Sequence, residues 1–483
     1  MNLADLFDNI EYESNFELCS AEINNITHDI KATTDKSLIV TFTSPSKISR
    51  QEAKAAALIC NTLYKSDSTS FPTVYVKNPR LVYSLIASRL ANIDYNTIKF
   101  IGVTGTNGKT STATMIFEIM KSAGINVGMI GTGTVRYMDV SLTETNYSMT
   151  TPDPDMLFKS IKRMQCMGCK LIIMEVSSHS LALEKVAPIT FEISVFTSLS
   201  SEHMDFHKSM EDYYKTKLTL FMQSKKGVFN ADDSYSARAM RECESVCETS
   251  CIGIHHDADA MAKDISLNGL NGSSYVFRGQ NCIFRVNPKL AGYHNIYNSM
   301  LAIKCAMEYG ISEHIARNAI DSLTTIPGRC EIIHENPFII IDYAHTEGAF
   351  ENILKTIHSI KLSNQTLYTV FGCGGERDKN KRPKMARIAE KYSDKIIVTS
   401  DNPRNENPIE IIDDILKGIE DLTCRDVIPD RKTAIEYAIK KAKSNDIILI
   451  LGKGHEQYVI DKDGYHFFNE REICSRILEE RNN

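Results

Sequence analysis

The chain has 483 residues, enough for about three domains of ordinary size, and its apolar content is sufficient for a sizeable core. A net charge of −6 with both signs mixed argues against nucleic-acid or membrane-surface partners, and thirteen scattered cysteines indicate reduced thiols in a cytoplasmic protein. The sequence shows no signal peptide and no apolar run long enough to span a membrane.

Residues 1–97 form the first predicted unit, and no motif in them is typical of catalysis. Short apolar runs at Ser37–Phe42 and Thr73–Val76 predict strands. The alanine-rich segment Gln51–Thr62 predicts a helix, and Val82–Leu90 predicts a second one. We therefore expect a small α/β domain.

A phosphate-binding loop begins the second unit. Strand Ile98–Val103 leads into the sequence T-G-T-N-G-K-T, and a helix is expected over 110–123. Glycines let backbone N–H groups turn inward around an anion, and the helix N-terminus adds partial positive charge. Lys109 can reach terminal phosphates, and the Thr110 hydroxyl can reach Mg²⁺. The pattern predicts an ATP or GTP site; the alternative is a glycine-rich turn with a surface lysine.

Strands and helices alternate through the second unit and again through residues 329–483. Strands at Val127–Ile130, Leu171–Glu175 and Ile193–Thr197 predict a parallel, doubly wound sheet with its site at the strand carboxyl ends. Residues 251–290 are rich in turns and short strand signals and predict a small β insertion. The third unit is Rossmann-like but lacks G-x-G-x-x-G after its first strand, so we do not expect it to bind NAD.

Two segments of the second unit are candidate metal sites. Glu175 ends a strand, where a carboxylate is well placed to hold Mg²⁺, although it could instead cap the next helix, as Ser177 or Ser178 could. The segment Glu202–His207 contains two histidines and two carboxylates. It is either a metal or phosphate contact or a solvated loop.

Other polar residues have an ordinary structural interpretation. Lys217 is expected to be a surface lysine on a helix. Asn295 could pair with adenine or cap a helix. Cys243, Cys247 and Cys251 recur every fourth residue and could share one helix face, which favours structural thiols over metal ligands.

Polar motifs follow four strands of the third unit. They begin at Asp342, Gly374, Asp401 and Gly452. Because the strand ends of a parallel sheet form one crevice, these motifs are expected to converge. Two arginines and a glutamate among them suit a zwitterionic amino acid, with guanidinium for its carboxylate and carboxylate for its ammonium group.

Together these motifs resemble those of the Mur ligases of peptidoglycan synthesis, in family order from about residue 98 to 475. They are T-G-T-N-G-K-T, M-E-V-S-S-H, the Glu202–His207 segment, G-x-H-N-x-x-N, P-G-R-x-E, D-Y-A-H, G-C-G-G-x-R-D-K-x-K-R-P, D-N-P-R and G-K-G-H-E. The resemblance implies three α/β domains. These are an N-terminal UDP-sugar-type domain over 1–97, a central P-loop ATPase-type parallel sheet over 98–328 and a C-terminal Rossmann-like amino-acid-binding domain over 329–483.

The resemblance also implies a reaction, and it is greatest to the branch that adds diaminopimelate. ATP phosphorylates a carboxylate, and an amine then displaces phosphate from the acyl phosphate. The implied donor is UDP-N-acetylmuramoyl-L-alanyl-D-glutamate, with two Mg²⁺ sites. By the same resemblance, Lys217 aligns with a lysine that is carbamylated in the family. A free ammonium group cannot ligate Mg²⁺, whereas the oxygens of a carbamate can. The implied catalytic residues are Lys109, Glu175, His203 and Lys217, and the implied metal ligands are Thr110, Glu175, His203 and Lys217.

Motif matches supply the remaining implied contacts. For ATP they are Thr104, Gly105, Thr106, Asn107, Gly108, Lys109, Thr110, Asn295, Asn298, Arg329 and Asp342. For the UDP-sugar peptide they are Thr150, Thr151, Ser177 and Lys185. For the amino acid they are Arg377, Asp401, Asn402, Arg404, Gly452 and Glu456. The resemblance implies that Arg404 binds the distal carboxylate of diaminopimelate, a group that the free amino acid lysine lacks.

The sequence departs from the family pattern mainly on the donor side. Ile26–Ile30 stands where D-S-R is expected, and Leu183 and Lys185 stand where Gln and Arg usually meet the UDP-sugar peptide. A second hypothesis is therefore a ligase of the same chemistry with a different carboxylate donor in a side pathway. A third is a non-catalytic nucleotide-binding descendant. In each case we expect small-molecule partners and a monomer.

Overall fold

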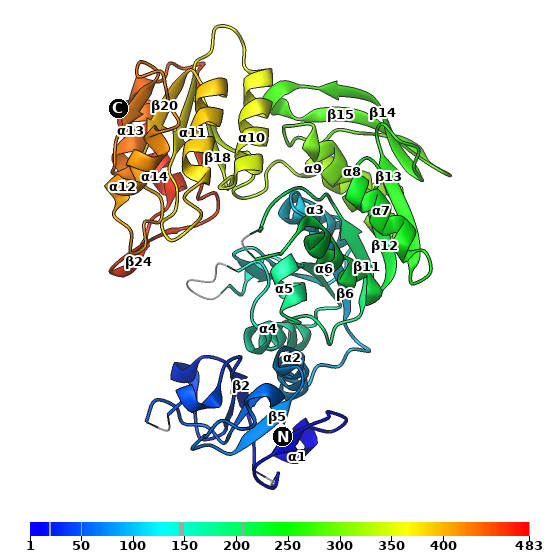
Figure 1. The fold of residues 1–483 in the computed structure, drawn as a ribbon. Helices are drawn as coiled ribbons and strands as arrows, with labels where there is room; N and C mark the ends of the chain where they lie inside the picture. Colours follow the sequence, from blue (N-terminus) through cyan, green and yellow to red (C-terminus); the bar gives the residue numbers. More distant parts are fainter. Residues whose placement is uncertain (19–20, 50, 144–148, 205, 483) are drawn as a thin grey trace. The chain divides into compact units, whose positions relative to one another are not determined.

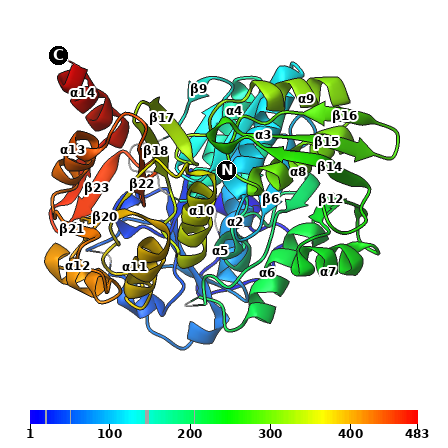
Figure 2. The ribbon, with the colours of Figure 1, turned by 90° about the horizontal axis from the view of Figure 1, so that it is seen from above.

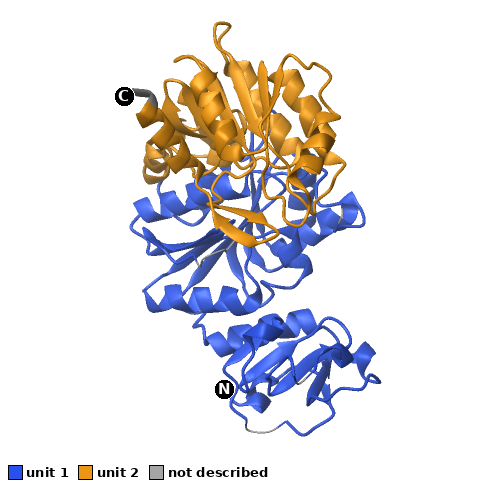
Figure 3. Cartoon of the chain, turned by 90° about the vertical axis from the view of Figure 1, so that its left-hand side faces the viewer, with its two compact units in different colours: residues 1–259, 301–312 blue, residues 260–300, 313–483 orange. Residues whose placement is uncertain are grey.

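A computed structural model describes residues 1–18, 21–49, 51–143, 149–204 and 206–482 (Figure 1). The chain divides into two compact units, residues 1–259 with 301–312 and residues 260–300 with 313–483 (Figure 3). The α/β class expected from the sequence is confirmed, whereas the three-domain boundaries stay a prediction. Among the described residues, no helix is both long and apolar enough to cross a membrane.

The N-terminal part of the first unit is a five-stranded sheet in the order β1-β5-β4-β3-β2. Its elements are α1 (Leu3–Leu6), β1 (Glu13–Ser14), β2 (Asn25–Thr27), β3 (Ser37–Val40), β4 (Ala57–Asn61), β5 (Thr73–Val76) and α2 (Pro79–Ala91). The helix predicted over Gln51–Thr62 is wrong, because this segment supplies β4 between β3 and β5. Ala57, Leu58 and Ile59 are fully buried there, and burial in a sheet outweighs the helix propensity of alanine.

The larger sheet of the first unit has its strands in the order β13-β12-β11-β6-β10-β7-β8-β9. They are β6 (Lys99–Thr104), β7 (Val127–Gly131), β8 (Thr134–Tyr137), β9 (Val140–Ser141), β10 (Leu171–Glu175), β11 (Phe191–Phe196), β12 (Ser224–Asn230) and β13 (Glu248–Gly253). The strands from β13 to β7 pair in parallel, as predicted. The antiparallel strands β8 and β9, which extend the sheet beyond β7, were not predicted.

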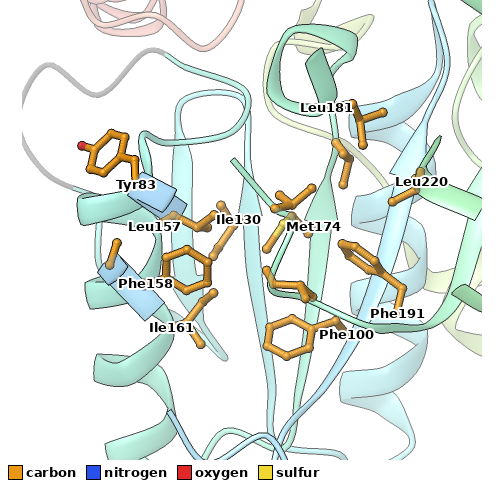
Figure 4. Packing of buried hydrophobic residues seen from close by; sticks show 14 of the residues in the cluster. Tyr83, Phe100, Ile130, Leu157, Phe158, Ile161, Met174, Leu181, Phe191 and Leu220 are labelled. Atoms are coloured by element: carbon orange, nitrogen blue, oxygen red, sulfur yellow. The ribbon is translucent and has the colours of Figure 1, made fainter. Parts of the chain in front are cut away.

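Five helices accompany this sheet: α3 (Lys109–Ser122), α4 (Pro154–Cys166), α5 (Ser178–Ala182), α6 (Met210–Met222) and α7 (Ser234–Cys243). Leu157 and Phe158 of α4 pack in one core with Ile130, Met174 and Phe191 from three strands (Figure 4). All five side chains are fully buried. This packing fixes the strands, so the loops at their carboxyl ends have defined starting points.

The cysteine pattern does not form a helix face. Cys243 is the last residue of α7, whereas Cys251 lies in β13. Both are buried, as is Cys247 between them, and all three are free thiols. The expected common face is therefore wrong, because the helix ends before the second cysteine.

The second unit begins with the antiparallel strands β14 (Ala260–Leu267), β15 (Ser273–Gly279) and β16 (Ile283–Val286), which confirms the predicted β insertion. Two helices follow, α8 (His294–Glu308), whose last turns belong to the first unit, and α9 (Glu313–Ser322).

A six-stranded sheet in the order β17-β18-β22-β19-β20-β21 makes up the rest of the unit. Its strands are β17 (Glu331–Glu335), β18 (Phe338–Asp342), β19 (Leu367–Phe371), β20 (Lys395–Val398), β21 (Arg425–Val427) and β22 (Ile447–Leu451). The helices are α10 (Glu347–Ile360), α11 (Lys381–Tyr392), α12 (Pro408–Leu416), α13 (Arg431–Lys441) and α14 (Glu470–Asn482). A hairpin of β23 (Tyr458–Asp461) and β24 (Gly464–Phe467) lies outside this sheet.

Helices cover both faces of this sheet (Figure 2). Ile340 of β18 packs with α10, α11 and α12, whereas its neighbours Ile339 and Ile341 pack with α13 and α14. Side chains alternate along a strand, so near-continuous apolar strands are the pattern of a sheet that is buried on both faces. The strands from β18 to β21 pair in parallel, so the carboxyl ends of all five lie at one common edge of the sheet.

Candidate active site

The phosphate-binding loop joins β6 to α3. Gly105 has φ of 143° and Gly108 has φ of 84°, backbone conformations that favour glycine. A Cβ atom at Gly105 would lie 1.9 Å from Oγ1 of Thr197. Nζ of Lys109 donates to the carbonyl oxygens of Gly105 and Thr106 at 2.9 and 2.8 Å. The lysine charge is thus held against the loop at the N-terminus of α3, where an anion is favoured.

Glu175 is fully buried at the carboxyl end of β10. Its Oε2 accepts hydrogen bonds from Oγ1 of Thr110 at 2.8 Å and Oγ1 of Thr132 at 3.2 Å, and its Oε1 accepts one from the Thr132 N–H at 3.0 Å. The helix-cap alternative does not hold, because the Ser177 hydroxyl caps α5 by accepting from the N–H of Ser180. Two hard oxygen atoms that could hold a metal ion, from Thr110 and Glu175, are therefore adjacent.

Lys217 is buried, so its prediction as a surface lysine is wrong. Its side chain is 1% exposed on α6, and Nζ donates to the carbonyl oxygen of Gly105 at 3.0 Å. Nζ also lies 4.8 Å from the ring centroid of Tyr213. Burial lowers the pKa of Lys217 well below its ordinary value, and the charge of Lys109 lowers it further, against the opposing effect of Glu202.

The histidines of the Glu202–His207 segment are packed against other rings. His203 has φ of 57°, and its ring centroid lies 4.9 Å from that of His179. His207 is buried, with Nε2 2.9 Å from Oγ of Ser178. Asp205 lies outside the described residues. In the part of the chain that the structure describes, no group of three His, Cys, Asp or Glu side chains could hold a metal. A magnesium site here therefore needs other oxygen ligands.

Four residues were predicted for the UDP-sugar peptide: Thr150, Thr151, Ser177 and Lys185. Oγ1 of Thr151 donates to the carbonyl oxygen of Glu175 at 2.9 Å, and Oγ1 of Thr150 lies 3.1 Å from Oγ1 of Thr132. The N–H of Ser177 lies 3.5 Å from Oγ1 of Thr151. Nζ of Lys185 forms an ion pair with Asp153 at 2.7 Å. The structure thus places these four residues around the end of β10.

The residues predicted for the adenine lie on α8 in the second unit. Nδ2 of Asn298 donates to Oδ1 of Asn295 at 3.0 Å, and Nδ2 of Asn295 donates to the carbonyl oxygen of Ala291 at 2.7 Å. Both asparagines are buried. Because Asn295 lies inside the helix, which begins at His294, it is not the N-cap that the sequence allowed as an alternative.

Asp342 and Arg329 lie close to one another in the second unit. The Asp342 carboxylate accepts from the N–H groups of Cys330 at 2.6 Å and Ala344 at 2.8 Å. Burial raises the pKa of Asp342, while the positive charge of Arg329 opposes the rise. The Arg329 guanidinium lies 4.9 Å from the ring centroid of Tyr343. Asp342 therefore organises the turn after β18 whatever it binds.

Of the four polar motifs that were predicted to converge, those after β22, β19 and β20 lie together. The fourth, at the end of β18, adjoins them, because the N–H of Gly452 donates to the carbonyl oxygen of Asp342 at 3.1 Å. Nδ2 of Asn402 donates to Oε2 of Glu456 at 3.0 Å. Nζ of Lys453 donates to Oδ1 of Asn402 at 2.8 Å and lies 3.6 Å from Oδ1 of Asp401. Gly452 has φ of 116°, and a Cβ atom there would lie 2.6 Å from Oδ2 of Asp401. We call the residues Asp401, Asn402, Arg404, Gly452 and Glu456 the acceptor cluster.

Arg404 links two of the strand-end loops. It has φ of 54°, and its NH1 group donates to the carbonyl oxygens of Gly375 at 2.9 Å and Asn402 at 3.4 Å. Its backbone N–H donates to the carbonyl oxygen of Ile460 in β23 at 3.0 Å. Arg377 is exposed on the Gly375 loop. The structure therefore brings Arg404 into the acceptor cluster, whereas the Arg377 side chain is exposed.

The acceptor cluster contains carboxylates in different electrostatic surroundings. Burial raises the pKa of Asp401, but the charges of Lys453 and Arg431 more than offset this and hold it below the ordinary value. Burial raises the pKa of Glu456, and the neighbouring Asp401 raises it further. Asp401 is therefore the more firmly ionised carboxylate of the two.

Comparison with known proteins decides the family. The family description "Mur ligase middle domain" matches residues 103–306, and "Mur ligase, glutamate ligase domain" matches residues 328–454. A Clostridium acetobutylicum protein named UDP-N-acetylmuramoyl-L-alanyl-D-glutamate–2,6-diaminopimelate ligase 1 is 35% identical over 99% of this chain and 100% of its own length. The chain belongs to the Mur ligase family. The predicted resemblance is thereby confirmed.

Other relatives cover the Mur ligase chain to a similar extent. A diaminopimelate ligase of the same name from Caldanaerobacter subterraneus is 37% identical over 99% of both chains. A solved structure of a ligase with that name is 26% identical, has a TM-score of 0.69 and covers 100% of this chain and 99% of its own. A pseudomurein peptide ligase type C from Methanothermus fervidus, 18% identical with a TM-score of 0.59 and covering 92% of this chain and 94% of its own, shares the fold.

Three buried residues that support the Mur ligase site were not predicted: Thr132, Arg382 and Lys453. Thr132 follows β7 directly, so its place at a strand end was a usable signal. Arg382 is fully buried on α11 and donates to Glu406 at 2.9 Å and Asp414 at 3.0 Å. It also lies within the motif that ends β19, but nothing in a basic run of residues predicts burial.

Substitution Gly131→Ala is expected to disturb the Glu175 carboxylate of this Mur ligase. A Cβ atom at Gly131 would lie 2.2 Å from Oε1 of Glu175, so the side chain must move away from Thr110. We expect a loss of about 1–3 kcal/mol in the free energy of unfolding and a raised Mg²⁺ requirement. Denaturant unfolding and a magnesium titration of phosphate release measure both.

Substitution Gly348→Ala is the matched control, because nothing lies within 4 Å of a Cβ atom there. Gly348 is in helix α10, where alanine is the better residue, so stability is expected to stay equal or rise. Equal behaviour of the two variants would contradict a close approach between Gly131 and Glu175.

Proposed function

We propose that this Mur ligase uses ATP to join meso-diaminopimelate to UDP-N-acetylmuramoyl-L-alanyl-D-glutamate in peptidoglycan synthesis. Relatives named for these substrates match it over nearly their whole length. The observation that carries the acceptor assignment is the grouping of Arg404, Asn402 and Glu456 at one sheet edge. The guanidinium group of Arg404 and the carboxylate of Glu456 at the same sheet edge suit a zwitterion that has a second carboxylate. A cytoplasmic monomer with small-molecule substrates completes the proposal.

The reaction has two steps. A carboxylate oxygen of the donor attacks the γ-phosphorus of ATP, the bond to the bridging oxygen breaks, and ADP leaves with an acyl phosphate formed. The acceptor amine then attacks the acyl carbon, inorganic phosphate leaves, and the amine proton passes to solvent. Lys109, at the N-terminus of α3, offsets the charge of the transferring phosphoryl group. The acceptor cluster orients the amine.

Thr110 and Glu175 fit a magnesium ion. The proposal has two Mg²⁺ sites, with His203 and Lys217 as the further ligands. The hydroxyl oxygen of Thr110, which is half-buried, lies 2.8 Å from a carboxylate oxygen of the fully buried Glu175, and Mg²⁺ prefers such oxygens. A bound Mg²⁺ supplies charge neutralisation at the phosphates. Glu175 and Thr110 also position the loop through their mutual hydrogen bond.

Carbamylation of Lys217 is the second part of the proposal. Burial lowers the pKa of Lys217, and this favours the uncharged, nucleophilic form of its amine. Its nitrogen attacks the carbon of CO₂, a C–N bond forms, and a proton leaves, which gives a carbamate with two oxygens. Lys109 supplies the nearby positive charge that favours this anion. The carbamate can ligate Mg²⁺, whereas an ammonium group cannot.

Phosphate release from ATP by the purified protein tests the proposal, with donor and acceptor omitted in turn. We expect release only when Mg²⁺, UDP-N-acetylmuramoyl-L-alanyl-D-glutamate and diaminopimelate are all present, and little with lysine. Dependence on diaminopimelate without dependence on this donor would favour the side-pathway ligase. Nucleotide binding without turnover on any pair of substrates would favour the non-catalytic descendant.

Substitution Arg404→Met is expected to raise the KM for diaminopimelate about 50-fold and to leave the KM for ATP unchanged. The change removes charge-assisted hydrogen bonds to the distal carboxylate. Steady-state kinetics with each substrate varied measures the effect. Arg387→Met, on α11, is the control and should behave as the unaltered protein. An unchanged KM for diaminopimelate would contradict the assignment of Arg404.

A further inference from the structure

Lys453 lies beneath the acceptor cluster and has no assigned role. Its side chain is fully buried, although lysine is rarely found in this state unless it is paired. Nζ donates to Oδ1 of Asn402 and to the carbonyl oxygen of Tyr458, both at 2.8 Å. The roles carried over from the motif fall on its neighbours Gly452 and Glu456. The question is therefore what this buried cation does for them.

The hydrogen bonds of Asn402 depend on Lys453. Oδ1 of Asn402 accepts from Nζ of Lys453 and from the N–H of Ile460 at 3.0 Å, while its Nδ2 donates to Oε2 of Glu456 at 3.0 Å. An amide can turn by 180° and exchange its donor and acceptor ends. Two donors directed at the oxygen exclude the turned orientation. Lys453 and the N–H of Ile460 together ensure that Asn402 presents its N–H₂ group to Glu456.

Lys453 also balances the charge of two buried carboxylates. Its Nζ lies 3.6 Å from Oδ1 of Asp401 and 3.9 Å from Oε2 of Glu456. The side chains of these acids are 9% and 13% exposed. Arg431 also faces Asp401, so loss of Lys453 would remove one of two compensating cations and increase the repulsion between the two carboxylates. The geometry of Glu456 therefore depends on Lys453 twice, through Asn402 and through charge.

We propose that Lys453 is a positioning residue for the acceptor amino acid, because it orients Asn402 and balances Asp401 so that Glu456 is held to receive an ammonium group. The identity of the acceptor rests on the function proposed above. The arrangement of Lys453, Asn402 and Glu456 does not depend on that function. The proposal can therefore be tested both with and without substrate.

The test compares Lys453→Met with Lys462→Met, an exposed lysine in the β23–β24 turn. A crystal structure of Lys453→Met is expected to show Glu456 displaced and its contact with Asn402 lost, because the cation that faces both Asp401 and Glu456 is gone. In kinetics, the KM for diaminopimelate is expected to rise about tenfold, while the KM for ATP stays within about twofold. Lys453→Gln keeps a hydrogen-bond donor but no charge, so its KM for diaminopimelate is expected to lie between those of the unaltered protein and Lys453→Met. It replaces the methionine variant in the test if that variant does not fold.

The outcomes separate this proposal from the function on which it rests. An unchanged Asn402–Glu456 contact in the variant would overturn the proposal, as would equal rises in every KM, which indicate general damage. Absence of diaminopimelate-dependent turnover in the unaltered protein would overturn the proposed function instead. In that case the crystal structure still decides the role of Lys453.

Discussion

Substitution Lys109→Met is expected to lower the rate of ATP-dependent phosphate release about a thousandfold. Methionine keeps most of the apolar stem and removes the ammonium group, which lies within 2.9 Å of two loop carbonyl oxygens at the N-terminus of α3. Lys109 is the one charged residue of the loop Thr104–Thr110, so no other substitution there removes a full positive charge from the surroundings of the transferring phosphoryl group. We expect kcat to fall in a continuous phosphate assay, while the unfolding midpoint stays close to that of the unaltered protein.

Substitution Lys121→Met is the control for this experiment. Lys121 is on the same helix, in its last turn, and forms an ion pair with Asp139 at the surface. Surface ion pairs contribute little to stability, so this variant should keep its rate within about twofold. A Lys109→Met protein that is as active as the control would contradict the assignment of the loop.

Substitution Lys217→Met is expected to lower kcat about a hundredfold without loss of the fold. The methionine side chain fills a similar volume, and it removes a buried amine that donates to the carbonyl oxygen of Gly105. If the carbamate is the active form, the unaltered protein should also lose activity in buffer depleted of CO₂ and regain it when bicarbonate is added. The Lys217→Met variant should not respond to bicarbonate.

Lys215 provides the matched control on the same helix. It is exposed and pairs with Glu211 at 3.7 Å, so Lys215→Met should keep both its rate and its response to bicarbonate. Full activity of Lys217→Met would rule out a ligand role for this lysine. Activity that is lost together with the circular dichroism signal would instead indicate that its role is structural.

Sequence patterns were sufficient for most of the regular elements. Apolar strands between helices, such as Thr73–Val76 and Leu171–Glu175, were predicted with their observed bounds because the strands are short and buried. The segment Gln51–Thr62 failed because local propensity favours a helix, whereas the neighbouring strands β3 and β5 make it a strand. The strands β8 and β9 at the end of the larger sheet were missed because they carry little of the apolar signal.

The candidate site could be predicted where one short segment carries the chemistry. The glycines and lysine of the phosphate-binding loop lie next to each other in the sequence, and so do Asn402 and Arg404. Lys217 could not be recognised as buried, because its environment comes from a loop more than 100 residues away. Lys453 was missed for the same reason, since its partner Asn402 lies 51 residues earlier.

In the C-terminal sheet, the residues that form the apolar cores are different from the residues proposed to bind the amino acid. Its strands carry isoleucine, leucine and valine into two apolar cores and end before any residue of the acceptor cluster begins. Selection or engineering can therefore exchange residues of one loop, such as Arg404, without altering the hydrophobic interior that stabilises the domain. Each loop starts from a different strand, so changes can accumulate one at a time. This arrangement explains in physical terms how one scaffold can acquire a preference for a new amino acid.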